Sequence, residues 1–155
     1  MLAACGGGAA PAPTLHNEAP APAVDQGGLA IALERTACLG ACPEYRVAIT
    51  RDGEVSWRGT ANVRLIGDAR GSIDRRHLDQ LAVLLDMAKF YAREPDGHLG
   101  KTATITICTD LPSVKLEATD RGHHNAIDYD GCQKDPDLEN LINEIEHIAG
   151  TSAWR

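Results

Sequence analysis

The sequence predicts an α+β domain, in which an antiparallel sheet follows the order βββα-βββα and both helices pack on one face. Three observations support this prediction. Short segments that alternate apolar and polar residues indicate strands with one buried face, because successive side chains of a strand point to opposite faces. Glycine-containing turns separate these segments and indicate hairpins. Two longer segments place apolar residues at helical spacing, which indicates helices that cover a sheet.

The first group of expected strands lies between residues 29 and 66. The strands are 29–35, 45–50 and 55–59, with 62–66 as a further short strand. Asp52-Gly53 marks a hairpin turn before the third strand, because glycine accepts a positive φ without steric cost. These strands are therefore expected to follow one another as a β-meander.

The first helix is expected at residues 73–90. Either Ser72 or Asp74 can cap its start, since short polar side chains accept hydrogen bonds from the first free N–H groups of a helix. Its apolar residues recur every three or four positions and form one face. These residues are Leu78, Leu81, Leu85 and Ala88.

The pattern then recurs in the second half of the chain. The expected strands are 103–108, 114–118 and 124–129. Asp135-Pro136 is typical of a helix start, with a capping residue followed by a first-turn proline, and Gly150 is typical of a helix end. The apolar face of this second helix consists of Leu138, Leu141, Ile142, Ile145 and Ile148.

Composition and charge limit the classes of function. The chain has 155 residues, of which 43% are hydrophobic and only 4% aromatic, so the expected core is mainly aliphatic. The net charge is -7 with scattered cations, which gives nucleic-acid binding no electrostatic support. No apolar run approaches the roughly 20 residues that a membrane-spanning helix needs.

The first residues resemble a lipid-attachment site. Leu2-Ala3-Ala4-Cys5 resembles the cleavage site of bacterial lipoprotein signals, in which the cysteine becomes the lipid-bearing N-terminus. Residues 1–4 would then be the end of a signal peptide, 5–28 a Gly/Ala/Pro-rich tether, and 29–155 a single domain. A signal peptide also needs basic and apolar regions, so an earlier start or a trimmed chain is expected. The alternative is a disordered cytosolic N-terminus in which Cys5 occurs by chance.

The lipoprotein resemblance implies a location. Gly6, rather than aspartate, follows Cys5, and this resembles lipoproteins that are sent to the outer membrane. We therefore expect a cell-envelope protein that faces the periplasm and is held to the membrane through lipid on Cys5. Several acyl chains give firm attachment, because each buried methylene contributes about 0.8 kcal/mol.

The other four cysteines are expected to form disulfides in that oxidising compartment. Four cysteines allow three pairings. A bond between Cys38 and Cys42 requires Cα atoms within about 7 Å, and Gly40 would allow the tight turn that brings them together. Cys108 and Cys132 could pair where the ends of two strands meet. The favoured interpretation is that all four cysteines only stabilise the fold.

The alternative interpretation is a thiol-redox or copper site. Cys38, Cys42 and the following Pro43 are similar to the Cys-x-x-x-Cys-Pro motif of the Sco copper-chaperone family, in which two thiolates and a distant histidine hold copper. His123 or His124 could supply the third ligand. In that family the motif leads into a helix, whereas here Pro43 leads into an expected strand. Adjacent histidines on a strand also point to opposite faces, so one site could use only one of them.

The spacing around the first two cysteines resembles the signature of an uncharacterised bacterial envelope family, catalogued only as a domain of unknown function. The similar residues are Arg35-Thr36, Cys38, Gly40, Cys42-Pro43 and Tyr45, then Asp52-Gly53, Thr109-Asp110-Leu111-Pro112, Tyr129-Asp130-Gly131, Gly150-Thr151 and Trp154. The resemblance implies no catalytic residue and no cofactor. We therefore predict a binding or structural module whose partner is an envelope protein, a peptide or a glycan.

Overall fold

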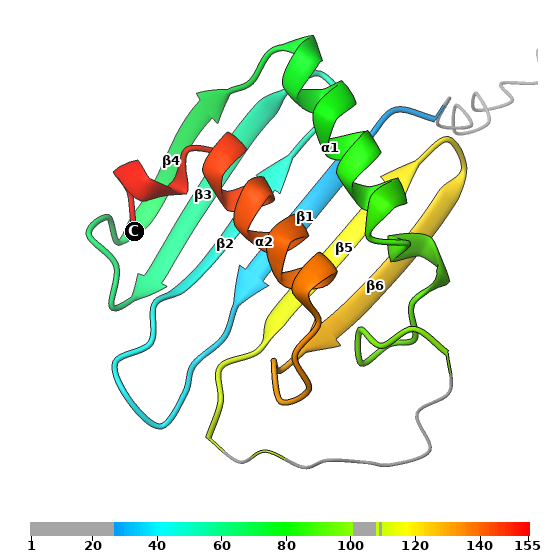
Figure 1. Ribbon diagram of the computed structural model, residues 1–155. Coiled ribbons are helices and arrows are strands. Elements are labelled where there is room, and N and C mark those ends of the chain that lie inside the picture. The colour runs from blue at the N-terminus through cyan, green and yellow to red at the C-terminus, as the bar shows by residue number, and fades with distance from the viewer. Residues whose placement is uncertain (1–26, 101–107, 109) are drawn as a thin grey trace, which may run out of the picture.

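A computed structural model describes residues 27–100, 108 and 110–155 of the chain. It contains one six-stranded sheet in the order β4-β3-β2-β1-β5-β6, in which every neighbouring pair is antiparallel. Both α-helices cover the same face of the sheet (Figure 1). The elements are β1 (Ala30–Arg35), β2 (Glu44–Ile49), β3 (Glu54–Ala61), β4 (Gly67–Ser72), α1 (Arg75–Met87), η1 (Phe90–Ala92), β5 (Val114–Asp120), β6 (His123–Tyr129), α2 (Pro136–Ile148) and η2 (Thr151–Ala153).

The first strand lies in the middle of the sheet. Arg35, the last residue of β1, pairs with Tyr45 of β2 on one side and with Val114 of β5 on the other, and Val114 pairs with Tyr129 of β6. These four residues define one end of the sheet, which we call the Arg35 end. The opposite end, which we call the Ala30 end, holds Ala30, Thr119 and His124 in one row.

The alternation along the strands separates a buried face from an open one. In β2 and β3 every second side chain is buried, and the buried side chains lie under the helices. Tyr45 and Trp57 stack there with ring centroids 4.4 Å apart, although aromatic residues are scarce in the chain. Phe90 and Tyr129 are also buried, and the rest of the core is aliphatic, as expected, with fully buried residues Leu33, Val47, Ile49, Leu81, Leu85, Leu116, Leu138, Leu141 and Ile145.

The α+β class and the antiparallel sheet are confirmed, but the order βββα-βββα is wrong. Four strands precede α1, and two strands follow it among the described residues. The fourth strand is β4, whereas the expected strand at 62–66 is the connection before it. The apolar pattern missed β4 because this edge strand pairs through its backbone and turns only Ala69 toward the core cluster. Of the expected strand at 103–108, only Cys108 is described, and it lies outside any strand.

The helices follow their predicted signals. The side chain of Asp74 accepts the N–H of His77 and caps α1, and Asp135 accepts the N–H of Leu138 and caps α2. Helix α1 is shorter than expected, since Lys89 adopts a left-handed φ of 51° and the chain continues as η1. Among the described residues, the helices lack the length and apolar character needed to cross a membrane.

Candidate functional site

Both disulfides lie beyond the Arg35 end of the sheet. Cys38 and Cys42 belong to the connection between β1 and β2, whereas Cys108 precedes β5 and Cys132 follows β6 (Figure 1). The Cα atoms are 5.7 Å apart in each pair, within the reach of a disulfide. The structure therefore places Cys38 with Cys42 and Cys108 with Cys132 at disulfide distance, and three chain segments are fastened next to one end of the sheet.

Gly40 does not serve the first disulfide in the way that the sequence suggested. Its φ is not positive, and a Cβ added to it would meet only the sulfur of Cys38, at 3.7 Å. Its backbone N–H instead donates a hydrogen bond to that sulfur, over 3.2 Å. The loop between the two cysteines closes without a conformation that only glycine can adopt.

A buried carboxylate lies directly behind this end of the sheet. Glu146 of α2 is only 4% exposed. The guanidinium of Arg35 donates to both of its oxygens, from Nε over 2.5 Å and from Nη2 over 3.0 Å. The Tyr45 hydroxyl donates to Oε1 in a very short hydrogen bond, and Arg155 donates to Oε2 over 3.2 Å. Three side chains therefore satisfy one buried acid, as burial of a charge requires.

The electrostatics of this cluster favour a neutral tyrosine. Burial, together with the hydrogen bond to Glu146 and the charge of Glu146, raises the pKa of Tyr45 to about 12. Burial acts to lower the pKa of Arg35, but the hydrogen bond and charge of Glu146 outweigh it, so that the Arg35 pKa rises. The cluster is thus held as a charged pair with a protonated phenol.

Sequence reasoning missed Glu146, although a signal was present. Glu146 lies four residues after Ile142 and eight after Leu138, on the stripe of α2 that faces the sheet. An acid at that spacing within an apolar stripe predicts a buried charge with a partner. Its partner Arg35 was named only as part of the family resemblance.

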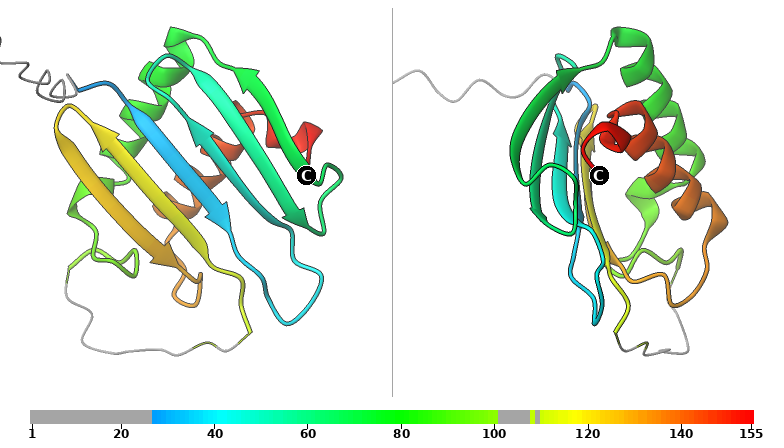
Figure 2. Two further views of the ribbon diagram at one scale, coloured as in Figure 1. Left: turned by 180° about the vertical axis from the view of Figure 1, so that it is seen from behind. Right: turned by 90° about the vertical axis from the view of Figure 1, so that its left-hand side faces the viewer.

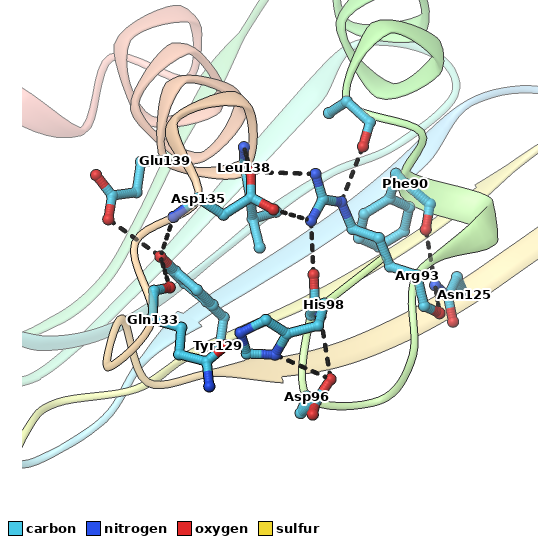
Figure 3. A network of polar contacts seen from close by, with 12 residues as sticks. Phe90, Arg93, Asp96, His98, Asn125, Tyr129, Gln133, Asp135, Leu138 and Glu139 are labelled. Atoms are coloured by element: carbon cyan, nitrogen blue, oxygen red, sulfur yellow. Dashed lines mark hydrogen bonds and ion pairs between the residues drawn. The ribbon is translucent and has the colours of Figure 1, made fainter. Parts of the chain in front are cut away.

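A second buried ion pair fixes the start of α2 (Figure 3). The Arg93 side chain is 0% exposed and lies 2.5 Å from Asp135, the capping residue of α2. Its remaining N–H groups donate to the carbonyls of Ala88 and Gly97, over 2.8 and 2.6 Å. Arg93 therefore connects the end of α1, the following loop and the start of α2.

Tyr129 extends this network toward the surface (Figure 3). Its hydroxyl lies 3.0 Å from the carboxylate of Glu139 and 3.1 Å from the carbonyl of Gln133, and it accepts the N–H of Asp135 over 3.2 Å. Lys134 lies 3.2 Å from the same carboxylate of Glu139. Residues 133–135, directly before α2, are thus each held by Tyr129 or Glu139.

A cavity of about 310 Å³ opens between the two networks. Its wall includes charges of both signs, namely Arg35 and Lys134 against Asp130 and Glu139. Its other lining residues are Leu111, Pro112, Val114, Tyr129, Gly131, Ile142 and Asn143. With apolar surface and a few polar groups, the cavity can hold part of a ligand, as binding clefts do.

Two exposed leucines lie at the Arg35 end, and one of them, Leu111, lines this cavity. Leu39, between Cys38 and Cys42, is 82% exposed, and Leu111 is 47% exposed. Large apolar side chains that remain in water at a stapled loop are candidates for contact with another molecule. The Arg35 end therefore combines a cavity, two disulfides and apolar side chains, and we take it as the candidate functional site.

The alternative copper set is not brought together. His124 belongs to the Ala30 end and contacts Glu117 on the open face, while the His123 ring lies 5.6 Å from the ring of Tyr91. The length of β1, about 17 Å, separates these histidines from the end that carries Cys38 and Cys42. Within the described parts of the chain, no three His, Cys, Asp or Glu side chains form a group that could hold a metal ion. Cys5 lies outside the described residues.

The Arg93–Asp135 pair generates the first prediction. Asp135→Asn keeps an oxygen to cap α2 but leaves the Arg93 guanidinium buried without an opposing charge. We expect a loss of about 2–3 kcal/mol in unfolding free energy, below the usual cost of breaking a fully buried pair because Asp135 is 21% exposed. Urea denaturation of the disulfide-intact protein measures this loss.

The matched control is Asp74→Asn, which changes the other helix cap in the same way at an exposed site and should leave stability almost unchanged. Burial acts to raise the pKa of Asp135, but the hydrogen bonds from Arg93 and Leu138 outweigh it and lower that pKa. The cost of Asp135→Asn should therefore be complete above the pKa of an unfolded aspartate, about 3.9, and should shrink as the pH falls from there through the lower pKa of Asp135 in the folded protein. Equal losses for the two variants would contradict the proposed role of Arg93.

The tyrosines generate the second prediction. The chain has three tyrosines, and burial raises the pKa of all three, to about 12 for Tyr45 and for Tyr91. At pH 10 the tyrosines of the unfolded chain are about half ionised, whereas Tyr45 and Tyr91 of the folded protein should be almost entirely protonated and Tyr129 less ionised than in the unfolded chain. The stability that the folded protein gains because its phenol groups keep their protons is fully present below about pH 10. It is lost as the pH rises through about 12. Near-ultraviolet titration of folded and urea-unfolded protein tests this, and coinciding curves would refute it.

Comparison with known proteins places these features in a family. The family model described as Domain of unknown function (DUF6438) matches residues 29–149, a range that runs from the start of the sheet to the end of α2. No curated protein matches the chain. The match confirms the prediction that the chain belongs to a domain family of unknown function. The envelope location and the signature around Cys38 and Cys42 stay predictions. The chain belongs to the family of domains of unknown function DUF6438.

Proposed function

We propose that this domain is a lipid-anchored, non-catalytic binding module of the cell envelope, which presents its Arg35 end to a protein or peptide partner. The anchor would be lipid on Cys5, with the domain facing the periplasm and attached to the outer membrane. The observation that carries the proposal is Leu39, which is 82% exposed in a disulfide-closed loop at the same end of the sheet as the mixed-charge cavity.

The direction of the chain supports this arrangement. The described chain starts at residue 27, next to Ala30 and therefore at the Ala30 end of the sheet. The β1 strand then runs for about 17 Å to the Arg35 end. A membrane anchor upstream of residue 27 would hold the domain by its Ala30 end. The loops that carry the disulfides would then face away from the membrane, where a partner can reach them.

The fixed geometry of the Arg35 end suits binding. Two disulfides and two buried ion pairs hold the segments around the cavity. A binding surface that is ordered before it meets its partner loses less conformational entropy on binding than a mobile one does. This arrangement therefore favours a preformed binding surface.

The surface chemistry favours a polypeptide partner over a glycan. Leu39 and Leu111 offer apolar contacts, and Lys134, Asp130 and Glu139 offer charges of both signs. A polypeptide supplies matching apolar side chains, charges and backbone amides. Glu146, the least exposed acid among the described residues, is bound by three side chains. This arrangement fixes structure and does not free a proton acceptor for a substrate.

Site-specific photocrosslinking in living cells tests this proposal. The full chain, with its natural upstream sequence, would carry a photoreactive amino acid at position 39 or, as a control, at position 83. Val83 is also an exposed apolar residue, at 56%, but it lies on α1. We expect a discrete crosslinked product from position 39 only, in the membrane fraction. With Cys5→Ser, which removes the lipid site, the product should move to the soluble fraction.

Charge reversal in the cavity sharpens the test. Lys134→Glu should reduce the crosslinked product at least several-fold, because Lys134 lines the cavity. Lys115→Glu makes the same charge change on the open face of the sheet and should leave the yield unchanged. No product at position 39, or equal products at positions 39 and 83, would reject the binding surface. A product that a glycan-degrading treatment removes would identify the other class of partner.

A further inference from the structure

The two edges of the sheet differ in how they are covered. At the β6 edge, the backbone N–H of Asp128 donates to the carbonyl of Pro95 over 2.7 Å. The Asn125 side chain donates to the carbonyls of Phe90 and Arg93, over 2.7 and 3.0 Å. The segment after α1 therefore occupies this edge.

No such cover lies over the β4 edge in the described part of the chain. The backbone hydrogen bonds of residues 67–72 there are those of the ladder with β3. Trp154 packs against Gly71, but it does so from the helix layer. In the right-hand view of Figure 2, β4 faces the viewer with no other element in front of it. Every second residue of such a strand presents free N–H and C=O groups.

The charged side chains of β4 can pair with those of a second copy of the same strand. Asp68 and Arg70 are exposed and lie on the same face, two residues apart, with Ala69 between them. If a second copy pairs antiparallel with Ala69 opposite Ala69, each Asp68 lies opposite the Arg70 of the other copy. This single register forms two symmetric ion pairs. An antiparallel pairing centred on Asp68 or on Arg70 would instead place that residue opposite its own copy. Like charges would then face each other, which is unfavourable.

Within their own chain, Asp68 and Arg70 make only one weak, exposed ion pair with described residues. Asp68 lies 3.5 Å from Arg58, and both side chains are more than two-thirds exposed. Arg70 makes no ion pair with another described residue. Near the edge, Ile66 is 60% exposed and would lose contact with water beside a second copy.

We propose that two copies of this chain associate through antiparallel pairing of their β4 strands, so that the sheet continues across a two-fold axis. Such an interface uses the same strand on both copies and is closed at two members. Six residues per strand bury less than the roughly 1,000 Å² of a stable interface, so the dimer is weak and concentration-dependent. The inference does not depend on the proposed function, although confinement to a membrane would raise the effective concentration.

The test is a pair of opposite charge reversals. Analytical ultracentrifugation of the full, disulfide-bonded chain should show a monomer–dimer equilibrium. Asp68→Arg and Arg70→Asp should each weaken dimerisation by about tenfold or more, because each creates two like-charge pairs. An equimolar mixture of the two variants should regain dimers, since each introduced charge then meets an opposite charge on the other copy.

Asp128→Arg, on the covered β6 strand, makes the same charge change as Asp68→Arg and should leave dimerisation unaltered. Circular dichroism verifies that each variant is folded. The proposal is overturned if the wild-type chain stays monomeric up to about 1 mM. It is also overturned if the mixture of variants dimerises no better than either alone, or if Asp128→Arg weakens the dimer equally.

Discussion

The ion pair between Arg35 and Glu146 is the interaction on which the candidate site depends. Glu146 belongs to the last turns of the chain's final α-helix, whereas Arg35 ends the central strand. A carboxylate that is 4% exposed must be paired, because burial of an isolated charge is far more costly than any single contact can repay. Tyr45 and Arg155 complete its coordination. The requirement to satisfy this acid fixes α2 over the sheet in one position.

That position determines the shape of the Arg35 end. Once α2 is fixed, its start lies close to the end of β6, and Arg93 meets Asp135 there. The cavity opens between these two polar networks, and Arg35 belongs both to one network and to the cavity wall. The disulfides then fasten the loops around it. Binding at this end and the position of α2 are therefore physically connected.

The sequence was sufficient for features that depend on local pattern. The Asp52-Gly53 hairpin and the Asp135 cap each follow from a few neighbouring residues, and the structure contains both. The four cysteines alone left three pairings open, and the structure pairs Cys38 with Cys42 and Cys108 with Cys132. Strand β4 was missed because the interpretation counted apolar residues, and an edge strand held by its backbone needs few of them. The spacing of Glu146 within the apolar stripe of α2 was a local signal of a buried acid, but its partner Arg35 lies 111 residues away. The partner of Arg93 lies 42 residues away, and no local spacing identifies either pair.

A double-mutant cycle between Arg35 and Glu146 tests the central claim most directly. Unfolding free energies would be measured for Arg35→Met, for Glu146→Leu and for the double variant. Each single change removes one member of the pair and should cost about 2–3 kcal/mol, because Glu146 keeps Tyr45 and Arg155 in Arg35→Met and because Arg35 is 22% exposed. The double variant removes both charges. We predict that the double variant loses at least about 1 kcal/mol less than the sum of the two single losses. Losses that add within about 0.5 kcal/mol would contradict the account.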